Sequence, residues 1–483
     1  MIAPLIVSAL ISASSHAPLD LGWAILFGPA IFWRQLIGAR AKTAFLSTWL
    51  WCFLYGCFLG WPIAYLIKDQ TNSWFAAIVG LTLIIGLQAL FLAPFGLIAV
   101  RMRGILIPIG FAAAWTVVNY LRGLGPTGFV WGHFGVALHD LPLLALPIRW
   151  MGTWGLEFLI ALLNATIALA FWKRRFWPLP FALLALWFGL GLGVRSSLPQ
   201  PDGSLKVAVC QPNVELNRHF DDSEQDTVRA ILFDQIEEAA AKGAQLVIFP
   251  ESIETDDDAF DIYQSMAERL QITIMLGAPR RTDSGSFGTV FSFMPNYEID
   301  FYDKVRAVPF GEFIPFRPVL GFAESLGAVG GDLLIGAEAR PIQSGHRILV
   351  GAPLCMESTY PWIAAEMSRR GTQLFALGSN ESWFGRTPAL DQHAAFTALR
   401  AMETGKVWAR SAPQAVSGFW HPDGKKAAFS KFVAQVSVQN APLFNAPTLA
   451  SRLGDWPVWA MAALLVLLLL RPAVYLPNDV RQP

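Results

Sequence analysis

Cysteine is scarce in this sequence, with four residues among 483. A secreted domain that depends on disulfides has more cysteines at regular spacings, so a disulfide framework is excluded. Cys52 and Cys57 lie in an apolar run, and Cys210 ends the strand-like segment KVAVCQPN, where buried and inert thiols are expected. Cys355 is the thiol whose role is left to explain.

Charge is scarce as well, but only in one part of the chain. Residues 1–195 hold 16 charged side chains, whereas residues 196–454 hold 52. The formal net charge is zero and no basic stripe occurs, which excludes a nucleic-acid partner. This division predicts, in order, a membrane domain at 1–195, a linker at 196–205, a water-soluble domain at 206–454, a final transmembrane helix at 455–474 and a cytoplasmic tail at 475–483.

Several apolar runs are long enough to cross a membrane, which takes about 20 residues for a hydrocarbon core about 30 Å thick. They lie at 18–38, 44–67, 74–100, 104–121, 145–171, 176–195 and 456–474. A shorter run at 2–14 is interpreted as a first span. The N-terminal domain is therefore expected to have six to seven spans, and the whole chain eight when the short run is counted.

Basic residues predict the orientation of these spans, because Lys and Arg in short loops stay on the cytoplasmic side. They occupy alternate loops, at Arg40 and Lys42, at Arg101 and Arg103, and at 173–175. We therefore expect the water-soluble domain on the opposite side of the membrane, tethered at both ends.

From residue 196 onward, short apolar runs alternate with amphipathic stretches, a pattern typical of an α/β layered fold. A helix is expected at 223–242, where apolar residues recur on one stripe and Gly243 follows the end. Strands are expected at 206–212, 245–250, 272–277, 288–294, 347–354, 373–378 and 411–419. The sequence thus predicts a sandwich of sheets and helices.

Three of the segments suit acyl-transfer chemistry. LVIFPES contains Glu251, FYDKVRAVPFGEFIP contains Lys304 and Glu312, and ILVGAPLCMES contains Cys355 and Glu357. A thiol with a pKa of about 8.5 needs a base or a cation to react at neutral pH. A buried carboxylate can take its proton, and a lysine can stabilise the oxyanion of the tetrahedral intermediate. Each residue alone is more often a solvated surface group, but together they predict a nucleophilic site.

Histidine, the usual partner of a catalytic cysteine, is absent from these three segments. The seven histidines of the chain also show no metal-ligand spacing. No metal and no other cofactor is therefore expected.

The ordered motifs FPE, YDK with PFGEFIP, LCME and SNESWFG resemble those of the nitrilase, or carbon–nitrogen hydrolase, superfamily. A nitrilase-like domain between a multi-span region and a last spanning helix is similar, more narrowly, to the bacterial apolipoprotein N-acyltransferases. The stretches AAAWTVVNYLRGLGPTGFVWGHFG and MGTWGLEFLIALLN extend this resemblance into the membrane part. The resemblance implies a polytopic α-helical membrane domain joined to an α-β-β-α sandwich.

The resemblance also implies roles for the residues of the predicted site. Glu251 would be the general base, Lys304 the cation that stabilises the oxyanion, and Cys355 the acylated nucleophile, with Glu312 and Glu357 in support. A phospholipid would donate an acyl chain, and the N-terminal amine of a diacylglyceryl-cysteine lipoprotein would accept it. The implied location is the bacterial inner membrane, with the catalytic domain in the periplasm.

Four further residues are expected to line the substrate site. Asn380 and Trp383 keep the family pattern, whereas Met356 stands where Tyr is usual and Phe220 where Trp is usual. The loss of the tyrosine hydroxyl beside the nucleophile is the departure closest to the predicted chemistry.

Other departures leave the acceptor open. Residues 410–418, RSAPQAVSG, replace an Asn-rich turn, and Glu381 with Ser382 replaces an Asp-Ala pair. A diverged membrane-bound paralogue, of the conjugal-transfer or the amidase and thioesterase kind, would pass the same thioester to another acceptor or to water. A non-catalytic envelope protein is a third hypothesis, which retention of all three reactive residue types opposes.

Overall fold

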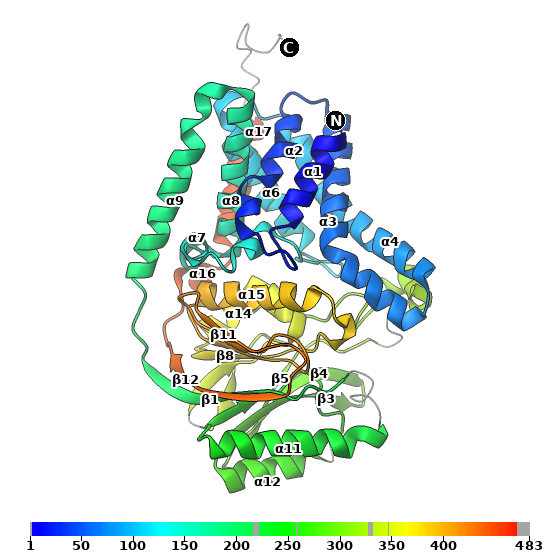
Figure 1. The fold of residues 1–483 in the computed structure, drawn as a ribbon, viewed down its shortest axis with the longest axis vertical. Helices are drawn as coiled ribbons and strands as arrows, with labels where there is room; N and C mark the ends of the chain where they lie inside the picture. Colours follow the sequence, from blue (N-terminus) through cyan, green and yellow to red (C-terminus); the bar gives the residue numbers. More distant parts are fainter. Residues whose placement is uncertain (1, 216–221, 257–258, 327–331, 346, 471–483) are drawn as a thin grey trace.

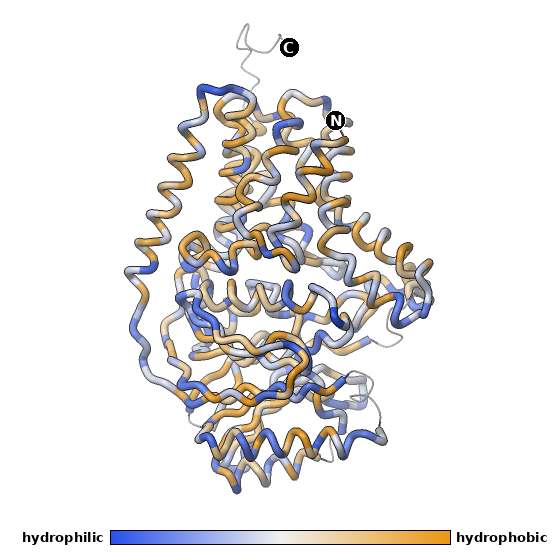
Figure 2. Tube along the Cα trace, viewed as in Figure 1, coloured by the Kyte–Doolittle hydropathy of each residue, from blue (hydrophilic) through white to orange (hydrophobic). Residues whose placement is uncertain are grey.

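The structure is a computed structural model that describes residues 2–215, 222–256, 259–326, 332–345 and 347–470. It has two parts stacked along its longest axis, a bundle of helices and an α/β sandwich (Figure 1). Hydrophobic residues dominate the bundle helices, whereas hydrophilic residues are much more frequent in the sandwich (Figure 2). The contrast in charge along the sequence therefore corresponds to two parts of the fold.

The bundle consists of apolar helices around a buried core rich in tryptophan and phenylalanine. Its helices are α1 (Ile2–Ala13), α2 (Gly28–Leu36), α3 (Ala41–Thr71), α4 (Trp74–Leu92), α5 (Pro94–Ala99), α6 (Ile107–Arg122), α7 (Pro142–Ala145), α8 (Ile148–Trp172), α9 (Pro178–Ser196) and α17 (Trp456–Leu470). Within the described part of the chain, five stretches are long and apolar enough to cross a membrane: Ala41–Thr71, Trp74–Ala99, Gly104–Arg122, Ile148–Trp172 and Arg174–Ser196. The predicted membrane domain is confirmed in this coarse sense.

The prediction of one continuous membrane span at 18–38 is wrong. These residues make a 3-10 turn at Gly22–Leu26 and then α2, whose 9 residues are too few to cross a membrane. The Asn164 side chain of α8 stabilises the break, because it donates to the Ile25 carbonyl at 2.9 Å and accepts from the Ala30 N–H at 3.0 Å. A buried side-chain amide thus replaces the helical hydrogen bonds that a continuous span would have made.

The ends of the bundle differ in what surrounds them. The connections from α2 to α3 and from α8 to α9, which contain basic residues, lie at the end away from the sandwich (Figure 1). The connection from α6 to α8, residues 123–147, lies at the other end, where its 3-10 turn Phe134–Leu138 contacts helix α15 of the sandwich. The α6–α8 connection is therefore part of the contact between the two domains.

The sandwich has two six-stranded sheets, each with a parallel centre and antiparallel edges. The first has the order β12-β1-β2-β3-β4-β5 and the second β11-β10-β9-β8-β7-β6. The strands of the first are β1 (Gly203–Gln211), β2 (Leu246–Ile248), β3 (Thr273–Thr282), β4 (Gly285–Phe293), β5 (Ile299–Asp303) and β12 (Gln435–Leu443). Those of the second are β6 (Ile342–Ser344), β7 (Ile348–Gly351), β8 (Leu374–Gly378), β9 (Trp408–Ser411), β10 (Gly418–Trp420) and β11 (Lys426–Ala428).

Helices cover the outer face of each sheet. On the first sheet lie α11 (Gln225–Ala241) and α12 (Phe260–Leu270), which share a buried apolar cluster with β1 to β4. On the second lie α14 (Pro361–Arg369) and α15 (Ala389–Thr404), between that sheet and the bundle (Figure 1). Shorter helices are α13 (Arg317–Leu320) and α16 (Leu449–Leu453). The predicted α-β-β-α sandwich is confirmed, and one helical layer faces the membrane domain.

Most predicted strands are present, with boundaries shifted by a few residues. The exception is 411–419, where β9 and β10 pair antiparallel across a turn instead of forming one strand. The unpredicted strands are β5, β6, β11 and β12, which are short or partly exposed and lack the apolar runs that mark the central strands.

Candidate active site

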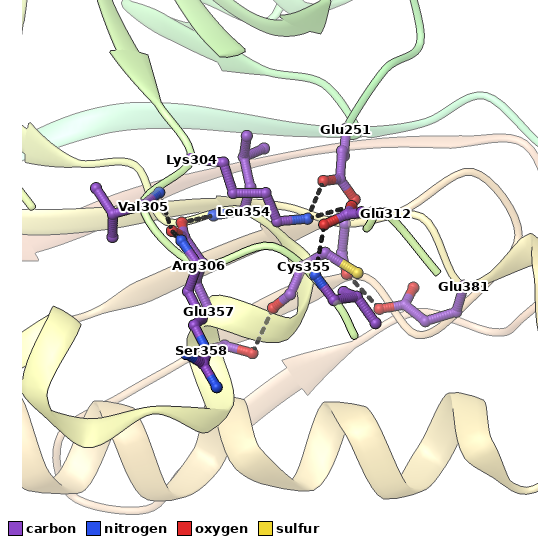
Figure 3. A network of polar contacts seen from close by, with 12 residues as sticks. Glu251, Lys304, Val305, Arg306, Glu312, Leu354, Cys355, Glu357, Ser358 and Glu381 are labelled. Carbon is purple, nitrogen blue, oxygen red and sulfur yellow. Dashed lines mark hydrogen bonds and ion pairs between the residues drawn. The ribbon is translucent and has the colours of Figure 1, made fainter. Parts of the chain in front are cut away.

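The three residue types predicted to react come together in the structure. Glu251 follows β2, Lys304 follows β5, and Cys355 begins the 3-10 turn η8 (Cys355–Thr359) after β7. Figure 3 shows the side chains of these three residues and of Glu312 pointing toward one another. They come from both sheets, so the packing of one sheet on the other is what assembles the cluster.

Lys304 lies between two carboxylates. Its Nζ donates to Glu251 Oε1 at 2.8 Å and to Glu312 Oε1 at 2.6 Å. Glu312 Oε2 in turn accepts from the backbone N–H of Val308 at 2.8 Å, which fixes the loop after Lys304. The lysine is only 2% exposed. A charge so buried is tolerable because both its partners are close and opposite in sign.

Glu357 joins the loop that contains Cys355 to the loop that contains Lys304. Its Oε1 accepts from the Tyr302 hydroxyl at 2.9 Å and from the Val305 N–H at 2.7 Å. Its Oε2 accepts from the Leu354 N–H at 2.8 Å. Glu357, which the sequence predicts to support the site, is thus a buried carboxylate that accepts hydrogen bonds from both loops.

Burial dominates the electrostatics of the cluster. It raises the pKa of the Glu251 carboxyl, an effect that the charge of Lys304 opposes. It also raises the pKa of the Cys355 thiol, and the charge of Glu251 adds to that effect. Burial would lower the pKa of Lys304, but Glu251 and Glu312 raise it well above its usual range. The resting site therefore holds a neutral thiol, hydrogen-bonded to Glu251, beside a firmly protonated lysine.

The backbone of Cys355 is strained. Cys355 has a φ of +46°, in the left-handed region that residues other than glycine rarely adopt. The Ser358 hydroxyl donates to the Cys355 carbonyl at 2.8 Å and helps to hold this conformation. Such strain is typical of functional sites, where the surrounding structure over-determines an unfavourable backbone.

Of the four residues expected to line the substrate site, three are described. Met356 follows the nucleophile and is 9% exposed, and Trp383 is 37% exposed on a 3-10 turn at Ser382–Phe384. The backbone of Asn380 is hydrogen-bonded to the Cys355 thiol. Phe220 lies outside the described residues. A contact between any of these side chains and a substrate stays a prediction.

Sequence reasoning missed a second charged cluster at Cys355. Glu381 accepts from Arg410 Nη2 at 2.5 Å and from Nδ1 of His393, whose Nε2 lies 3.2 Å from the Cys355 carbonyl oxygen. All seven histidines lie outside the three segments that predict the site, so the sequence does not indicate this contact. Helix α15 brings His393 to η8 by packing, and no local sequence pattern predicts that contact.

The same residues include the donors of a possible metal site. Ligand atoms of Cys355, Glu381 and His393 lie within 4.8 Å of one another, and thiolate, carboxylate and imidazole are a donor set that zinc accepts. Both ring nitrogens of His393 and Oε1 of Glu381 already have protein partners. These hydrogen bonds satisfy the histidine and that oxygen without an ion.

The site lies on the face of the sandwich that contacts the bundle. The Tyr360 hydroxyl donates to the Gly128 carbonyl at 2.8 Å, and Arg306 Nη2 donates to the Gly125 carbonyl at 2.7 Å. Gln392 Nε2 donates to the Ala17 carbonyl at 3.0 Å. The segments that follow Cys355 and Lys304 are therefore anchored directly on loops of the membrane domain.

A buried thiol, carboxylate and ammonium within an α-β-β-α sandwich define a protein of the carbon–nitrogen hydrolase class, here joined to a membrane domain. Comparisons with known families agree with this class. The carbon–nitrogen hydrolase family matches residues 206–438, and the apolipoprotein N-acyltransferase N-terminal domain matches residues 8–166.

Curated relatives extend the match over nearly the whole chain. The apolipoprotein N-acyltransferase of Geobacter metallireducens is 28% identical over 436 residues, which cover 85% of this chain and 83% of the relative. That of Haemophilus influenzae is 27% identical over 498 residues, covering 96% and 93%. That of Pseudomonas putida is 28% identical over 482 residues, covering 94% and 92%. The chain is thus similar to apolipoprotein N-acyltransferases over nearly its whole length.

Among solved structures, this chain is similar to a nitrilase-superfamily amidase of Nesterenkonia. The TM-score is 0.38 and the sequence identity is 16%, and the match covers 51% of this chain and 93% of the amidase.

Proposed function

We propose that this protein moves an acyl chain from a phospholipid to Cys355 and then to the N-terminal amine of a diacylglyceryl-cysteine lipoprotein. The observation on which the proposal rests most is the position of Lys304, held between Glu251 and Glu312 beside a buried thiol. The similarity to apolipoprotein N-acyltransferases supports a lipoprotein acceptor over the alternative of a diverged paralogue with another acceptor.

In the first half-reaction Glu251 takes the thiol proton while Sγ of Cys355 attacks the ester carbonyl of the phospholipid. Lys304 stabilises the oxyanion that forms on the carbonyl oxygen. The tetrahedral intermediate then collapses, the lysophospholipid oxygen leaves with the proton from Glu251, and a thioester remains. The raised pKa of Glu251 supports this step, because a carboxylate of ordinary pKa is a weaker base.

In the second half-reaction the acceptor amine attacks the thioester carbonyl. Glu251 takes a proton from the attacking nitrogen, Lys304 again stabilises the oxyanion, and the amide forms as the Cys355 sulfur leaves. The sulfur recovers its proton from Glu251, which restores the resting site. The two half-reactions share one base and one cation, so the scheme is ping-pong catalysis through a covalent intermediate.

The contact of the site with the bundle supports lipid substrates. Each buried CH₂ group stabilises a lipid in the bilayer by about 0.8 kcal/mol, so neither a phospholipid nor a lipoprotein leaves the membrane readily. A site anchored through Tyr360 and Arg306 on loops of the membrane domain can meet such substrates at the membrane surface.

We also propose that the protein lies in the bacterial inner membrane with its catalytic domain in the periplasm. The support is the location of the basic loops α2–α3 and α8–α9 at the bundle end away from the sandwich (Figure 1). Loops rich in Lys and Arg stay in the cytoplasm, which leaves the sandwich on the other side.

The test uses the full-length protein in detergent with phosphatidylethanolamine. We expect a hydroxylamine-sensitive acyl adduct on Cys355 and release of lysophospholipid, both lost in Cys355→Ala and both kept in the control Cys57→Ala, which changes a thiol within helix α3. A diacylglyceryl-cysteine peptide should then discharge the adduct and become N-acylated. Absence of any adduct on the unaltered protein would overturn the proposal.

A second candidate function is acyl transfer to a different acceptor or to water. Met356 in place of tyrosine and the changed turn at 410–418 favour it. An adduct that forms on Cys355 but is not discharged by the diacylglyceryl-cysteine peptide would select this second function.

A further inference from the structure

The charged cluster of Glu381, His393 and Arg410 has no part in the reaction scheme above, although it lies against the nucleophile. The three side chains are at most 2% exposed. Figure 3 shows the Glu381 carboxylate facing Cys355, and ligand atoms of Cys355, Glu381 and His393 lie within 4.8 Å of one another. Burying three ionisable groups is unfavourable unless they are well paired. Their position beside the nucleophile therefore suggests that they have a function there.

Glu381 is held as an ionised acceptor. Its Oε1 accepts from the Ser379 hydroxyl, from Nδ1 of His393 and from Arg410 Nη2. Burial would raise the pKa of this carboxyl, but the charges of Arg410 and His393 bring it below its usual range. A carboxylate of low pKa is a weak base, so Glu381 is less suited than Glu251 to take the thiol proton. What it does is fix the His393 ring with Nδ1 as the donor.

His393 in turn holds the strained backbone of the nucleophile. Its Nε2 lies 3.0 Å from Ser358 Oγ and 3.2 Å from the Cys355 carbonyl oxygen. With Nδ1 protonated, a neutral ring accepts at Nε2 from the Ser358 hydroxyl, which then no longer donates to the Cys355 carbonyl. A ring protonated on both nitrogens donates from Nε2 to that carbonyl, to which the Ser358 hydroxyl can also donate. Since Cys355 has a left-handed φ, its carbonyl needs such partners to keep the thiol aimed at Glu251.

The other neighbour of His393 belongs to the membrane domain. The ring of Trp131 lies 5.7 Å from the His393 ring, centroid to centroid. Trp131 Nε1 donates to Gln392 Oε1 at 2.8 Å, and its carbonyl accepts from Arg122 at 3.1 Å. The tryptophan is therefore fixed to helix α6 through its backbone and to helix α15 through its side chain.

We propose that His393 is a positioning residue that makes the reactive conformation of Cys355 depend on contact with Trp131 of the membrane domain. Glu381 and Arg410 fix the ring, the ring and Ser358 fix the Cys355 carbonyl, and Trp131 confines the ring from the bundle. The thiol then has its full reactivity only when the sandwich is docked on the α6–α8 connection. This inference rests on the proposed function only in taking Cys355 as the nucleophile.

The contacts argue against simple filling of the core. An apolar side chain would fill the space beside Trp131 without the cost of burying a ring with two polar nitrogens. Both nitrogens of His393 instead meet polar atoms, one on the charged cluster and one on the nucleophile turn. If His393 only filled space in the core, its two ring nitrogens would not need polar partners at these positions.

The test measures the reactivity of the thiol itself in the full-length protein. Alkylation of Cys355 by iodoacetamide is followed by mass spectrometry of its peptide across a range of pH, and acyl-adduct formation from phosphatidylethanolamine is followed in parallel. We expect His393→Leu to slow both rates by about ten- to hundredfold, because small displacements of reacting groups have effects of this size. The KM for the phospholipid should not change, since the ring is not expected to touch the lipid.

Three further variants separate positioning from folding. His393→Gln, whose amide can still reach the turn, should recover part of the lost rate, and His421→Gln, on the loop after β10, should react like the unaltered protein. Trp131→Ala should resemble His393→Leu, whereas Trp131→Phe, which keeps an aromatic ring against His393, should keep most of the reactivity. If His393→Leu fails to fold, the Trp131 pair and His393→Gln still decide the question.

The inference is overturned if His393→Leu, or Trp131→Ala in a folded protein, alkylates and acylates at the unaltered rates at every pH. It is also overturned if the adduct rate falls only through a raised KM. These failures differ from failure of the proposed function, which would appear in the unaltered protein as absence of an adduct or as an adduct that the lipopeptide cannot discharge.

Discussion

Glu357 Oε1 lies 2.7 Å from the backbone nitrogen of Val305, the residue after Lys304. Its Oε2 lies 2.8 Å from the backbone nitrogen of Leu354, the residue before Cys355. One side chain thus joins a loop that follows the first sheet to a loop that follows the second. This carboxylate therefore helps to set the separation of Lys304 and Cys355.

Replacing this carboxylate by an amide should impair the reaction without abolishing the fold. In Glu357→Gln an NH₂ group faces backbone N–H donors, so one of the two loops must shift. We expect adduct formation on Cys355 to slow by about a hundredfold, the size of effect that a misplacement of about 1 Å can have. The control is Glu366→Gln on α14, whose carboxylate pairs with Arg370 at the surface. Equal adduct rates for the two variants would contradict this role of Glu357.

The pH dependence of acylation follows from the state of Glu251. Its pKa is raised by burial, and only the ionised form can take the thiol proton. The rate of adduct formation should therefore rise with pH, with an acid limb centred above the usual glutamate value of about 4.3. Because Glu251 is coupled to Lys304 and Glu312, the midpoint belongs to the group and not to one residue.

Stopped-flow measurement of adduct formation between acid and neutral pH tests this expectation. Glu251→Gln should lower the rate at neutral pH by about 10²- to 10⁴-fold, the usual contribution of a general base, and should remove the acid limb. An acid limb that persists unchanged in Glu251→Gln would assign the proton transfer to another group.

The sequence predicted that Glu251, Lys304 and Cys355 lie together better than it predicted the membrane spans. Glu251 and Cys355 each follow a buried parallel strand, and buried strands leave strong apolar runs, so the positions of both residues could be inferred. The apolar run at 18–38 has the composition of a membrane span, and composition does not show that a distant polar side chain will bond to its backbone. The amide of Asn164, more than a hundred residues later, accounts for the break.

The contact of His393 with the nucleophile turn could not be inferred in the same way. His393 lies in a helix whose residues are nearly all buried, so no amphipathic pattern indicates which side chains face η8. In the sequence Glu381 is only a departure from the family pattern, whereas in the structure its carboxylate accepts from Arg410 at 2.5 Å. Contacts of this kind arise from the packing of distant elements and have no local signature.

Removing the charge of Lys304 should destabilise the protein as well as inactivate it. Lys304→Met would leave Glu251 and Glu312 close together without their shared cation. An uncompensated buried charge typically costs about 3–5 kcal/mol, so the midpoint of thermal unfolding should fall by several degrees. Adding Glu312→Gln to Lys304→Met removes one of the two carboxylates and should recover part of the stability but none of the activity. A double variant no more stable than the single one would show that the pairing in Figure 3 contributes little to stability.

The backbone around Glu251 depends on the absence of a side chain at position 277. A Cβ on Gly277 of β3 would lie 2.6 Å from the Cα of Glu251 and 2.6 Å from the nitrogen of Ser252, and neither backbone atom can move aside cheaply. Gly277→Ala should therefore cost about 1–3 kcal/mol of stability, as overpacking usually does, and should displace the Glu251 carboxylate from Lys304. The matched control is Gly189→Ala in α9, where a Cβ would meet nothing within 4 Å.

Chemical unfolding and adduct formation, measured on both glycine variants, separate the two effects. At a temperature where the Gly277→Ala protein is folded, its adduct rate should still be well below that of Gly189→Ala, because the base is misplaced and not merely less often folded. If the folded Gly277→Ala protein acylated Cys355 at the control rate, the position of Glu251 would not limit the reaction. The assignment of the general base would then have to move to another carboxylate, and Glu357, whose pKa burial raises to about 7, would be the first to examine.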